Sequence, residues 1–313
     1  MAESIRHRIE ASGAGSVQER LKYWVRRRRV EPWLWIAPSM LVIAFVFVYP
    51  VIEIFHFSFL DLHSFPGTWV GLENYRIVFA DERFWGAMLH NVELLATIPI
   101  MVALALVIAV LIFERVRGWR FYRSLVLVPY VVPIVAIGIA FSFVFQNRGG
   151  MNQLLDAVGL GLLKRDWLGS PDWALFTVGF VIIWREVGFG VILFLARLGS
   201  VSEDIFDAAC IDGAGWWTKM RHIIIPELAT VIEFFVMINV IAMVSQVFNY
   251  IYVMTNGGPG FSTWVSELYI YRMAFMNNQL GQSSVVAVIL FLATILLIGL
   301  SSRFRRRLVD DYE

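Results

Sequence analysis

The 313-residue chain contains only three lysines, Lys22, Lys164 and Lys219, and none of them follows a glycine. A P-loop that cradles nucleotide phosphates has the pattern G-x-x-x-x-G-K-[ST], in which the lysine comes directly after a glycine. The sequence therefore contains no P-loop. If ATP drives the activity of this protein, we expect a separate subunit to bind the nucleotide.

Cysteine is almost absent as well. Cys210 is the only cysteine, so the chain forms no internal disulfide. The five histidines are scattered, and the sequence has no H-E-x-x-H motif, no Cys/His cluster and no nucleophile elbow. We find no catalytic or metal-binding constellation, and we predict a protein that is not an enzyme and holds no cofactor of its own.

Charged residues are sparse and apolar residues abundant. The sequence is 58% hydrophobic and 16% charged, whereas soluble domains are about 25% charged. Six runs reach the roughly 20 apolar residues that a helix needs to cross about 30 Å of hydrocarbon. In lipid the backbone polar groups must be satisfied internally, so these runs predict an all-α polytopic membrane protein with six transmembrane helices. The runs lie near 33–57, 90–113, 123–145, 173–195, 230–254 and 284–302.

Prolines in the first and third runs affect the expected helices. Pro50 lies in the first, and Pro129 and Pro133 lie in the third. Proline removes a backbone donor and kinks a helix, so we expect both runs to be interrupted at these positions.

The distribution of basic residues predicts the orientation. Of the 26 Lys and Arg residues, 19 lie in the two tails, in the loop 114–123 and in the connection after the fourth run, and six lie in the alternate loops. By the positive-inside rule, both termini are cytoplasmic. We predict a basic cytoplasmic tail over 1–32, a membrane domain over 33–302 and a second cytoplasmic tail over 303–313. The arginine clusters in both tails adjoin spans, so we expect lipid rather than nucleic acid beside them.

The most informative segment is residues 207–228, which read DAACIDGAGWWTKMRHIIIPEL. Apolar residues recur at helical spacing on both sides of Gly213, which indicates two short helices outside the membrane. Ser200 and Glu203 have the spacing of a capping box, and Pro226 restricts the chain before the next run. The small residues around the glycine allow another surface to approach closely.

This segment resembles the cytoplasmic coupling loop of ATP-binding-cassette import permeases. That loop has the pattern E-A-A-x-x-x-D-G-A, followed by I-x-x-P-x-L. The resemblance implies that the loop, residues 200–228, contacts ATP-binding subunits. The matching residues, with aspartate at the first position in place of the usual glutamate, are Asp207, Ala208, Ala209, Asp212, Gly213, Ala214, Pro226 and Leu228.

Other motifs are similar to the carbohydrate-uptake branch of these permeases, among them Gly71-Leu72-Glu73-Asn74-Tyr75 and Thr255-Asn256-Gly257-Gly258-Pro259. Their order resembles that of the first of two non-identical permease subunits. The resemblance implies a second permease, two ATP-binding subunits that hold the ATP, and an extracytoplasmic solute-binding protein. It also implies a location in the cytoplasmic membrane of a bacterium or archaeon.

Polar residues at membrane depth are costly and tend to face a cavity or another helix. In the fifth run Gln246, Asn249 and Tyr250 have the i, i+3, i+4 spacing of one helical face. In the fourth run, Glu186 lies one turn from Gly190, where we expect room for a ligand, and Trp184 offers an aromatic face. We interpret Trp184, Glu186, Gln246, Asn249 and Tyr250 as candidate sugar-binding residues.

Alternatives stay open at this point. The amides of the fifth run could instead form hydrogen bonds between helices. Arg185 is better suited to a gate or an inter-subunit contact than to sugar binding. A permease for a glycerol-phosphate-like polyol would need cations, and Arg185 is the only one within the runs. A secondary transporter driven by an ion gradient would use intramembrane carboxylates, of which Glu186 is the clear one.

Overall fold

The computed structural model describes residues 33, 35–62 and 67–310, and the surroundings of side chains as far as residue 299. It divides into two units, Met1–His56 and Phe57–Glu313. The predicted N-terminal tail, 1–32, lies outside the described residues. Residues 303–310 of the predicted C-terminal tail continue the last helix, α15 (Leu280–Asp310).

The first unit contains most of one apolar helix, Trp35–Phe57. It includes a π-helical turn, η1 (Ala44–Val48), followed by α2 (Tyr49–Phe57). Pro50 does not interrupt this helix, contrary to our expectation. The N–H of Tyr49 donates to the carbonyl of Ala44, five residues back. This wider turn accommodates the proline without a break.

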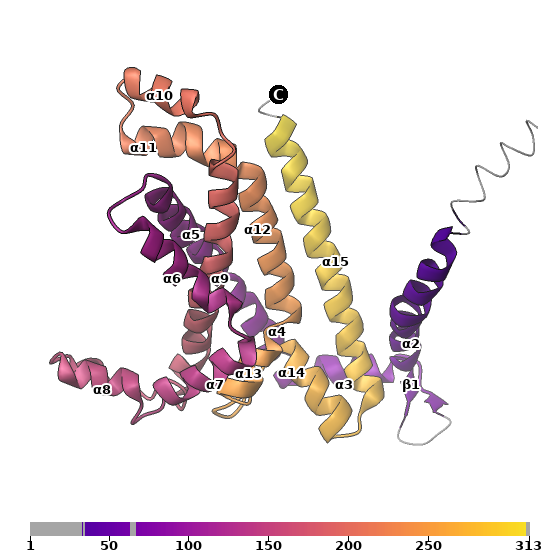
Figure 1. Cartoon of the computed structure of the whole chain (residues 1–313). Helices are drawn as coiled ribbons and strands as arrows, with labels where there is room; N and C mark the ends of the chain where they lie inside the picture. The colour runs from indigo at the N-terminus through magenta and orange to yellow at the C-terminus, as the bar shows by residue number, and fades with distance from the viewer. Residues whose placement is uncertain (1–32, 34, 63–66, 311–313) are drawn as a thin grey trace, which may run out of the picture. The chain divides into compact units, whose positions relative to one another are not determined.

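In the second unit, α9 (Pro171–Leu198) is the central helix (Figure 1). The helices that pack on it are α5 (Thr97–Phe113), α6 (Trp119–Val131) and α12 (Ile225–Ser245). A Cβ on Gly188 of α9 would lie 2.4 Å from the carbonyl oxygen of Val126 in α6. Glycine is therefore required there, as small residues commonly are where membrane helices pack closely.

The sequence prediction of an all-α membrane protein is confirmed. Among the described residues, five helices are long and apolar enough to cross a membrane. The third predicted span differs, because α6 and α7 (Ile134–Val144) meet at 101°. Pro133 directly precedes α7, where it lacks the N–H that would continue α6. The five helices are Trp35–Phe57, Glu82–Phe113, Pro171–Leu198, Trp216–Ser245 and Leu280–Gly299.

The fifth predicted span also differs from a single helix. It ends as α12 at Ser245 and resumes as α13 (Phe248–Met254). At its other end it is longer than predicted, because α11 (Trp216–Lys219) and the π-helical turn η3 (Met220–Ile224) lead directly into α12. Pro226 therefore lies inside a helix and not in a loop. As at Pro50, a five-residue hydrogen bond, from Ile225 N–H to the carbonyl of Met220, precedes the proline.

Shorter elements gather at the end of the second unit opposite to α11 (Figure 1). The Gly71–Tyr75 motif lies at the start of α3, and its Asn74 is a buried anchor. Asn74 Nδ2 donates to the carbonyl oxygens of Ser58 at 3.0 Å and Leu60 at 2.9 Å. The elements are the paired strands β1 (Leu60–Asp61) and β2 (Thr68–Trp69), the helices α3 (Glu73–Ala80), α8 (Gly150–Ala157), η2 (Gly161–Leu163) and α14 (Ser266–Tyr271), and the π-helical turn η4 (Arg272–Met276).

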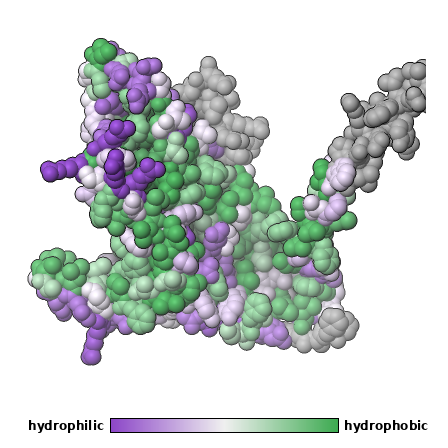
Figure 2. Space-filling model, in the orientation of Figure 1, coloured by the Kyte–Doolittle hydropathy of each residue, from purple (hydrophilic) through white to green (hydrophobic). Residues whose placement is uncertain are grey.

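Apolar side chains cover much of the middle of the visible face of the second unit, and many hydrophilic residues lie toward its two ends (Figure 2). This distribution suits a bundle whose middle lies in hydrocarbon, because apolar side chains on the surface then face lipid and not water.

Candidate functional site

The predicted coupling segment forms two helices, α10 (Glu203–Ile211) and α11, joined by a tight turn. Gly213 has φ +71°. Its N–H donates to the carbonyl of Cys210 at 3.1 Å, and the N–H of Ala214 donates to Ala209 at 2.9 Å. This is the hydrogen-bond pattern of a Schellman motif, whose left-handed position favours glycine. The backbone conformation of this turn therefore explains why residue 213 is glycine, without reference to a partner.

The predicted capping box at the start of this segment is wrong. Ser202 is the N-cap of α10, and its side chain accepts from the N–H of Asp204. Ser200 instead donates its hydroxyl to the carbonyl oxygen of Arg197 at 2.7 Å.

The coupling segment leaves much of its surface uncovered by the described residues. Ala209 is buried, whereas Ala208, Asp207 and Asp212 are exposed, and neither aspartate has an ion pair among the described residues. Ile211 is 86% exposed and Trp217 is 76% exposed. Helices α10 and α11 lie beyond the ends of α5 and α9 (Figure 1). A projecting surface with large exposed apolar side chains indicates an interaction site.

The coupling segment and its two ends form contacts with the spans. Arg197, near the end of α9, donates to the Glu227 carboxylate at 2.8 Å and to the Glu227 carbonyl at 3.1 Å. Phe206 of α10 packs on Phe113 of α5, with ring centroids 5.4 Å apart. A displacement of α10 would therefore act on α5 through Phe206, while the Arg197–Glu227 contact joins the ends of α9 and α12.

Arg185 and Glu186 form a pair in the middle of α9. Although adjacent residues on a helix point about 100° apart, the Arg185 guanidinium reaches the carboxylate of Glu186. It also donates to the carbonyl of Tyr130 at 3.2 Å and lies 4.9 Å from the centre of the Tyr130 ring. Arg185 is thus neutralised within this chain.

Three of the candidate sugar-binding residues lie on or near this pair. The hydroxyl of Tyr250 interacts electrostatically with Arg185 and Glu186 but has no hydrogen-bond partner of normal geometry among the described residues. Trp184 is exposed and packs edge-on against Phe141, at 5.0 Å between ring centroids.

The expected room beside Gly190 is absent. A Cβ at this position would lie 2.7 Å from Cβ of Ala105 and 2.9 Å from the ring of Phe235. Neighbouring side chains from α5 and α12 therefore fill the space beside this glycine, and a ligand would have to lie elsewhere along α9.

Gln246 and Asn249 do not share one helical face with Tyr250. Gln246 lies between α12 and α13 with φ −133°, whereas Asn249 belongs to α13. Both side chains are exposed and form no hydrogen bond with another described residue. The i, i+3, i+4 spacing holds only in a continuous helix, so the expected single face is wrong. The two amides are nevertheless available to a ligand or to another chain.

No local sequence pattern indicates the pair of residues that completes the break between α12 and α13. In an unbroken helix the N–H of Val247 would donate to the carbonyl of Met243. Here Val247 N–H donates to Glu267 Oε1 at 3.2 Å, and the Met243 carbonyl accepts from Asn91 Nδ2 at 2.9 Å. Asn91 Nδ2 also donates to Glu267 Oε2 at 3.3 Å. We call Asn91 and Glu267 the break clamp. Their separation by 176 positions in sequence left no local signal for it.

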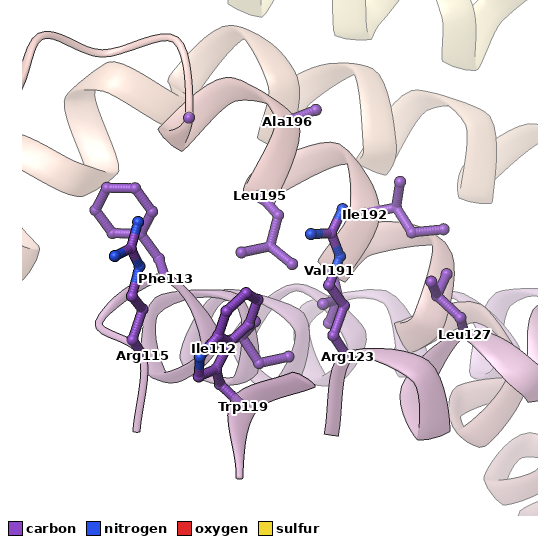
Figure 3. A pocket seen from close by; sticks show the side chains of 11 residues that line it. Ile112, Phe113, Arg115, Trp119, Arg123, Leu127, Val191, Ile192, Leu195 and Ala196 are labelled. Carbon is purple, nitrogen blue, oxygen red and sulfur yellow. The ribbon is translucent and has the colours of Figure 1, made fainter. Parts of the chain in front are cut away.

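A pocket of about 380 Å³ lies between α5, α6 and α9 at their ends nearest the coupling segment (Figure 3). The side chains of Arg115 and Arg123 flank that of Trp119 there. Arg115 has φ +56°, a left-handed conformation that is uncommon for a residue with a Cβ. None of the five candidate sugar-binding residues lines this pocket. Its lining residues are Ile112, Phe113, Arg115, Trp119, Arg123, Leu127, Val191, Ile192, Leu195, Ala196 and Gly199.

Known proteins are similar to this chain along most of its length. A probable ABC transporter permease protein of Bacillus subtilis is 31% identical over 287 residues, which cover 90% of this chain and 97% of that protein. A lactose transport system permease protein of Rhizobium radiobacter is 31% identical, covering 79% and 84%. An sn-glycerol-3-phosphate transport system permease protein of Escherichia coli is 29% identical, covering 90% and 95%.

The fold also matches a solved structure. A chain of a bacterial ABC transporter involved in the import of the acidic polysaccharide alginate superposes with a TM-score of 0.76 at 22% identity. The match covers 91% of this chain and 99% of that chain.

The family model for binding-protein-dependent transport system inner membrane components matches residues 101–310. This range holds most of α5 and the whole of α6, the central α9, the coupling segment, the break in the fifth span and α15. The chain therefore belongs to this family and is a multi-pass membrane permease subunit of an ABC importer.

Proposed function

We propose that this chain forms half of the translocation pathway of an ATP-driven importer for a sugar or an oligosaccharide. A second permease forms the other half, two separate subunits bind and hydrolyse ATP, and an extracytoplasmic solute-binding protein delivers the sugar. Both termini and the coupling segment lie in the cytoplasm, in agreement with the charge distribution.

The exposed coupling segment carries this proposal. Ile211 and Trp217 are exposed although they are large and apolar, and Asp207 and Asp212 have no ion pair among the described residues. Asp207, Ala208, Ala209, Asp212, Gly213 and Ala214 form the element that an ATP-binding subunit grips. Closure of the ATP-binding subunits would then pull on α9 and α12 through the Arg197–Glu227 contact.

The substrate class rests on relatives and on the chemistry of the candidate residues. A relative named for lactose transport is 31% identical. Amide and carboxylate groups suit sugar hydroxyls, and aromatic faces suit the apolar side of a sugar ring. Trp184, Glu186, Gln246, Asn249 and Tyr250 provide these groups.

The alternative, a glycerol-phosphate-like polyol, has the support of the relative named for glycerol-3-phosphate transport. A phosphate needs a free cation, and Arg185 is neutralised by Glu186. The arrangement therefore favours a neutral sugar.

Reconstitution tests the proposal. The chain is placed in liposomes alone, and in parallel together with its second permease and the ATP-binding subunits. We expect ATP hydrolysis and uptake of a radiolabelled sugar only in the complete system supplied with its binding protein. ATP-driven uptake by the lone chain would contradict the proposal. Uptake of glycerol phosphate in preference to every sugar offered would show that the substrate is a glycerol-phosphate-like polyol and not a sugar.

A further inference from the structure

We propose that the break clamp, Asn91 with Glu267, is a positioning device that holds Gln246 toward the transported solute. The proposal builds on the importer function proposed above. It assigns a role to two residues that lie outside the coupling segment and outside the set of candidate sugar-binding residues.

The geometry shows how the clamp replaces a helical hydrogen bond. A helix that unwinds at Gln246 leaves the Met243 carbonyl and the Val247 N–H without their helical partners, and burial of such groups without partners is costly. Asn91 of α4 (Glu82–Leu95) supplies the donor for Met243, and Glu267 of α14 supplies the acceptor for Val247. Asn91 Oδ1 also accepts from the N–H of Ser266 at 2.8 Å, which fixes α14 against α4.

The clamp acts directly on a candidate sugar-binding residue. Gln246 lies between the two clamped residues, Met243 and Val247, and its φ of −133° departs from helical geometry. Without the clamp, the backbone could recover the Met243–Val247 hydrogen bond by closing the helix. Closure would rotate Gln246 onto the regular helical path and change the direction of its amide.

Glu267 has no charged partner among the described residues. The ionisable groups on neighbouring elements are engaged elsewhere. His90 of α4 contacts the carbonyl of Trp264 at 2.7 Å, Tyr269 of α14 donates to Asp81 at 2.9 Å, and Arg272 of η4 donates to Asn256. The first turns of α15 contain no ionisable side chain.

Burial raises the pKa of Glu267 from the usual 4.5 to about 7. An ionised carboxylate accepts from both Val247 and Asn91, whereas protonation turns one oxygen into a donor that faces a donor. The clamp is therefore complete above about pH 7 and incomplete below it.

The effect on stability has the opposite sign. The folded-state pKa lies above the unfolded value, so the contribution of Glu267 to stability is full below about pH 4.5. It is lost as the pH rises toward about 7, the folded-state value. The complete clamp is thus the less stable form, which is common for residues that serve function.

The test compares Glu267→Gln with Glu82→Gln in the reconstituted four-subunit complex. Glutamine has one acceptor and one donor group, so it resembles the protonated carboxyl at every pH. Glu82, exposed at the start of α4, is the matched control. Between pH 8 and pH 6 we expect the KM of sugar uptake by the wild type to rise by about 5- to 10-fold, the equivalent of one lost hydrogen bond. In Glu267→Gln the KM should stay high at both pH values, and Glu82→Gln should follow the wild type.

A second readout is independent of transport. Amide hydrogen exchange over residues 243–250 should be unchanged by Glu82→Gln, and at pH 8 it should be altered by Glu267→Gln. A wild-type pH profile and wild-type exchange in Glu267→Gln would overturn the positioning role even where ATP-driven uptake is intact. Absence of uptake in the wild-type complex would instead count against the importer function, while the exchange result would still decide whether the clamp exists.

Discussion

The helices are interrupted after Ile211 and after Ser245, and the backbone groups freed at these two places find their hydrogen-bond partners in different ways. At the first, the turn through Gly213 satisfies its own backbone by local hydrogen bonds and presents exposed side chains outward. At the second, the backbone groups of Met243 and Val247 are buried and depend on Asn91 and Glu267 from distant parts of the chain.

The difference shows that the break in the fifth span is stabilised by other parts of this chain, whereas the coupling turn offers its surface to another subunit. The backbone of the coupling turn is satisfied within the chain, but the large apolar side chains of Ile211 and Trp217 stay mostly exposed among the described residues. At the break in the fifth span, distant residues satisfy the backbone, and the exposed amides of Gln246 and Asn249 form no hydrogen bond among the described residues. Substitutions at the first interruption should therefore disturb assembly or coupling, and substitutions at the second should disturb stability or substrate binding.

The largest effect is expected for Gly213→Trp. Among the described residues a Cβ at Gly213 meets nothing within 4 Å, so the spans should insert normally. A side chain at φ +71° is strained, and bulk in a fitted contact typically costs about 1–3 kcal/mol. We expect ATP-driven uptake to be lost and less ATP-binding subunit to co-purify, and Ala208→Trp to act likewise.

Gly213→Ala separates the two causes, because it adds strain with little bulk. It should retain part of the uptake if bulk dominates. Normal uptake by Gly213→Trp with the ATP-binding subunits still bound would show that this turn is not the coupling contact, and the contrast between the two interruptions would fail.

The next effect is a loss of stability from Asn91→Leu. Leucine has nearly the same shape but leaves the Met243 carbonyl and the Ser266 N–H without their partners. Each buried unsatisfied group costs about 1–3 kcal/mol, so thermal unfolding of the purified complex should shift clearly to lower temperature. Asn249→Leu removes an exposed amide that has no hydrogen bond among the described residues, and it should leave the unfolding temperature nearly unchanged. Equal shifts for the two variants would mean that the clamp adds no stability.

Binding should change when the free amides are removed. Gln246→Ala and Asn249→Ala each take away a group that we assign to the sugar, and one such hydrogen bond corresponds to roughly 5- to 150-fold in affinity. Uptake kinetics should show a raised KM with normal assembly of the complex. Unchanged kinetics in both variants would place the substrate away from this break.

The smallest effect is expected for Lys219→Ala in α11. Lys219 has no ion pair among the described residues, and surface substitutions of this kind usually stay within about 0.5 kcal/mol. Uptake and co-purification should match the wild type. A loss comparable with that of Gly213→Trp would extend the coupling contact from the turn into α11.

Local sequence patterns predicted the features that depend on local physics. Runs of about 20 apolar residues identified the long helices, and Gly213 between two helical patterns identified the coupling turn. The Asn74 motif was found as a pattern, but its role as a buried anchor for two carbonyls is visible only in the structure.

Predictions failed where the backbone depends on distant residues. Continuous periodicity over 230–254 gave no reason to break the helix at Gln246, because the acceptor that stabilises the break is Glu267 of another element. The same holds for Gly190, whose expected free space is filled by Ala105 and Phe235 from two other helices. A proline gives only a weak local signal: Pro133 marks a bend of 101°, whereas Pro50 and Pro226 follow π-helical turns within continuous helices.

The sequence by itself determined that the chain is a helical membrane protein with a projecting coupling turn, because apolar length, charge distribution and a left-handed glycine are local properties. The tertiary structure decided which polar groups meet. The contact of Arg185 with the carbonyl of Tyr130 and the insertion of Asn91 and Glu267 into a missing helical hydrogen bond both follow from the need of buried polar groups for partners. Those partners are selected by helix packing, which no single stretch of sequence contains.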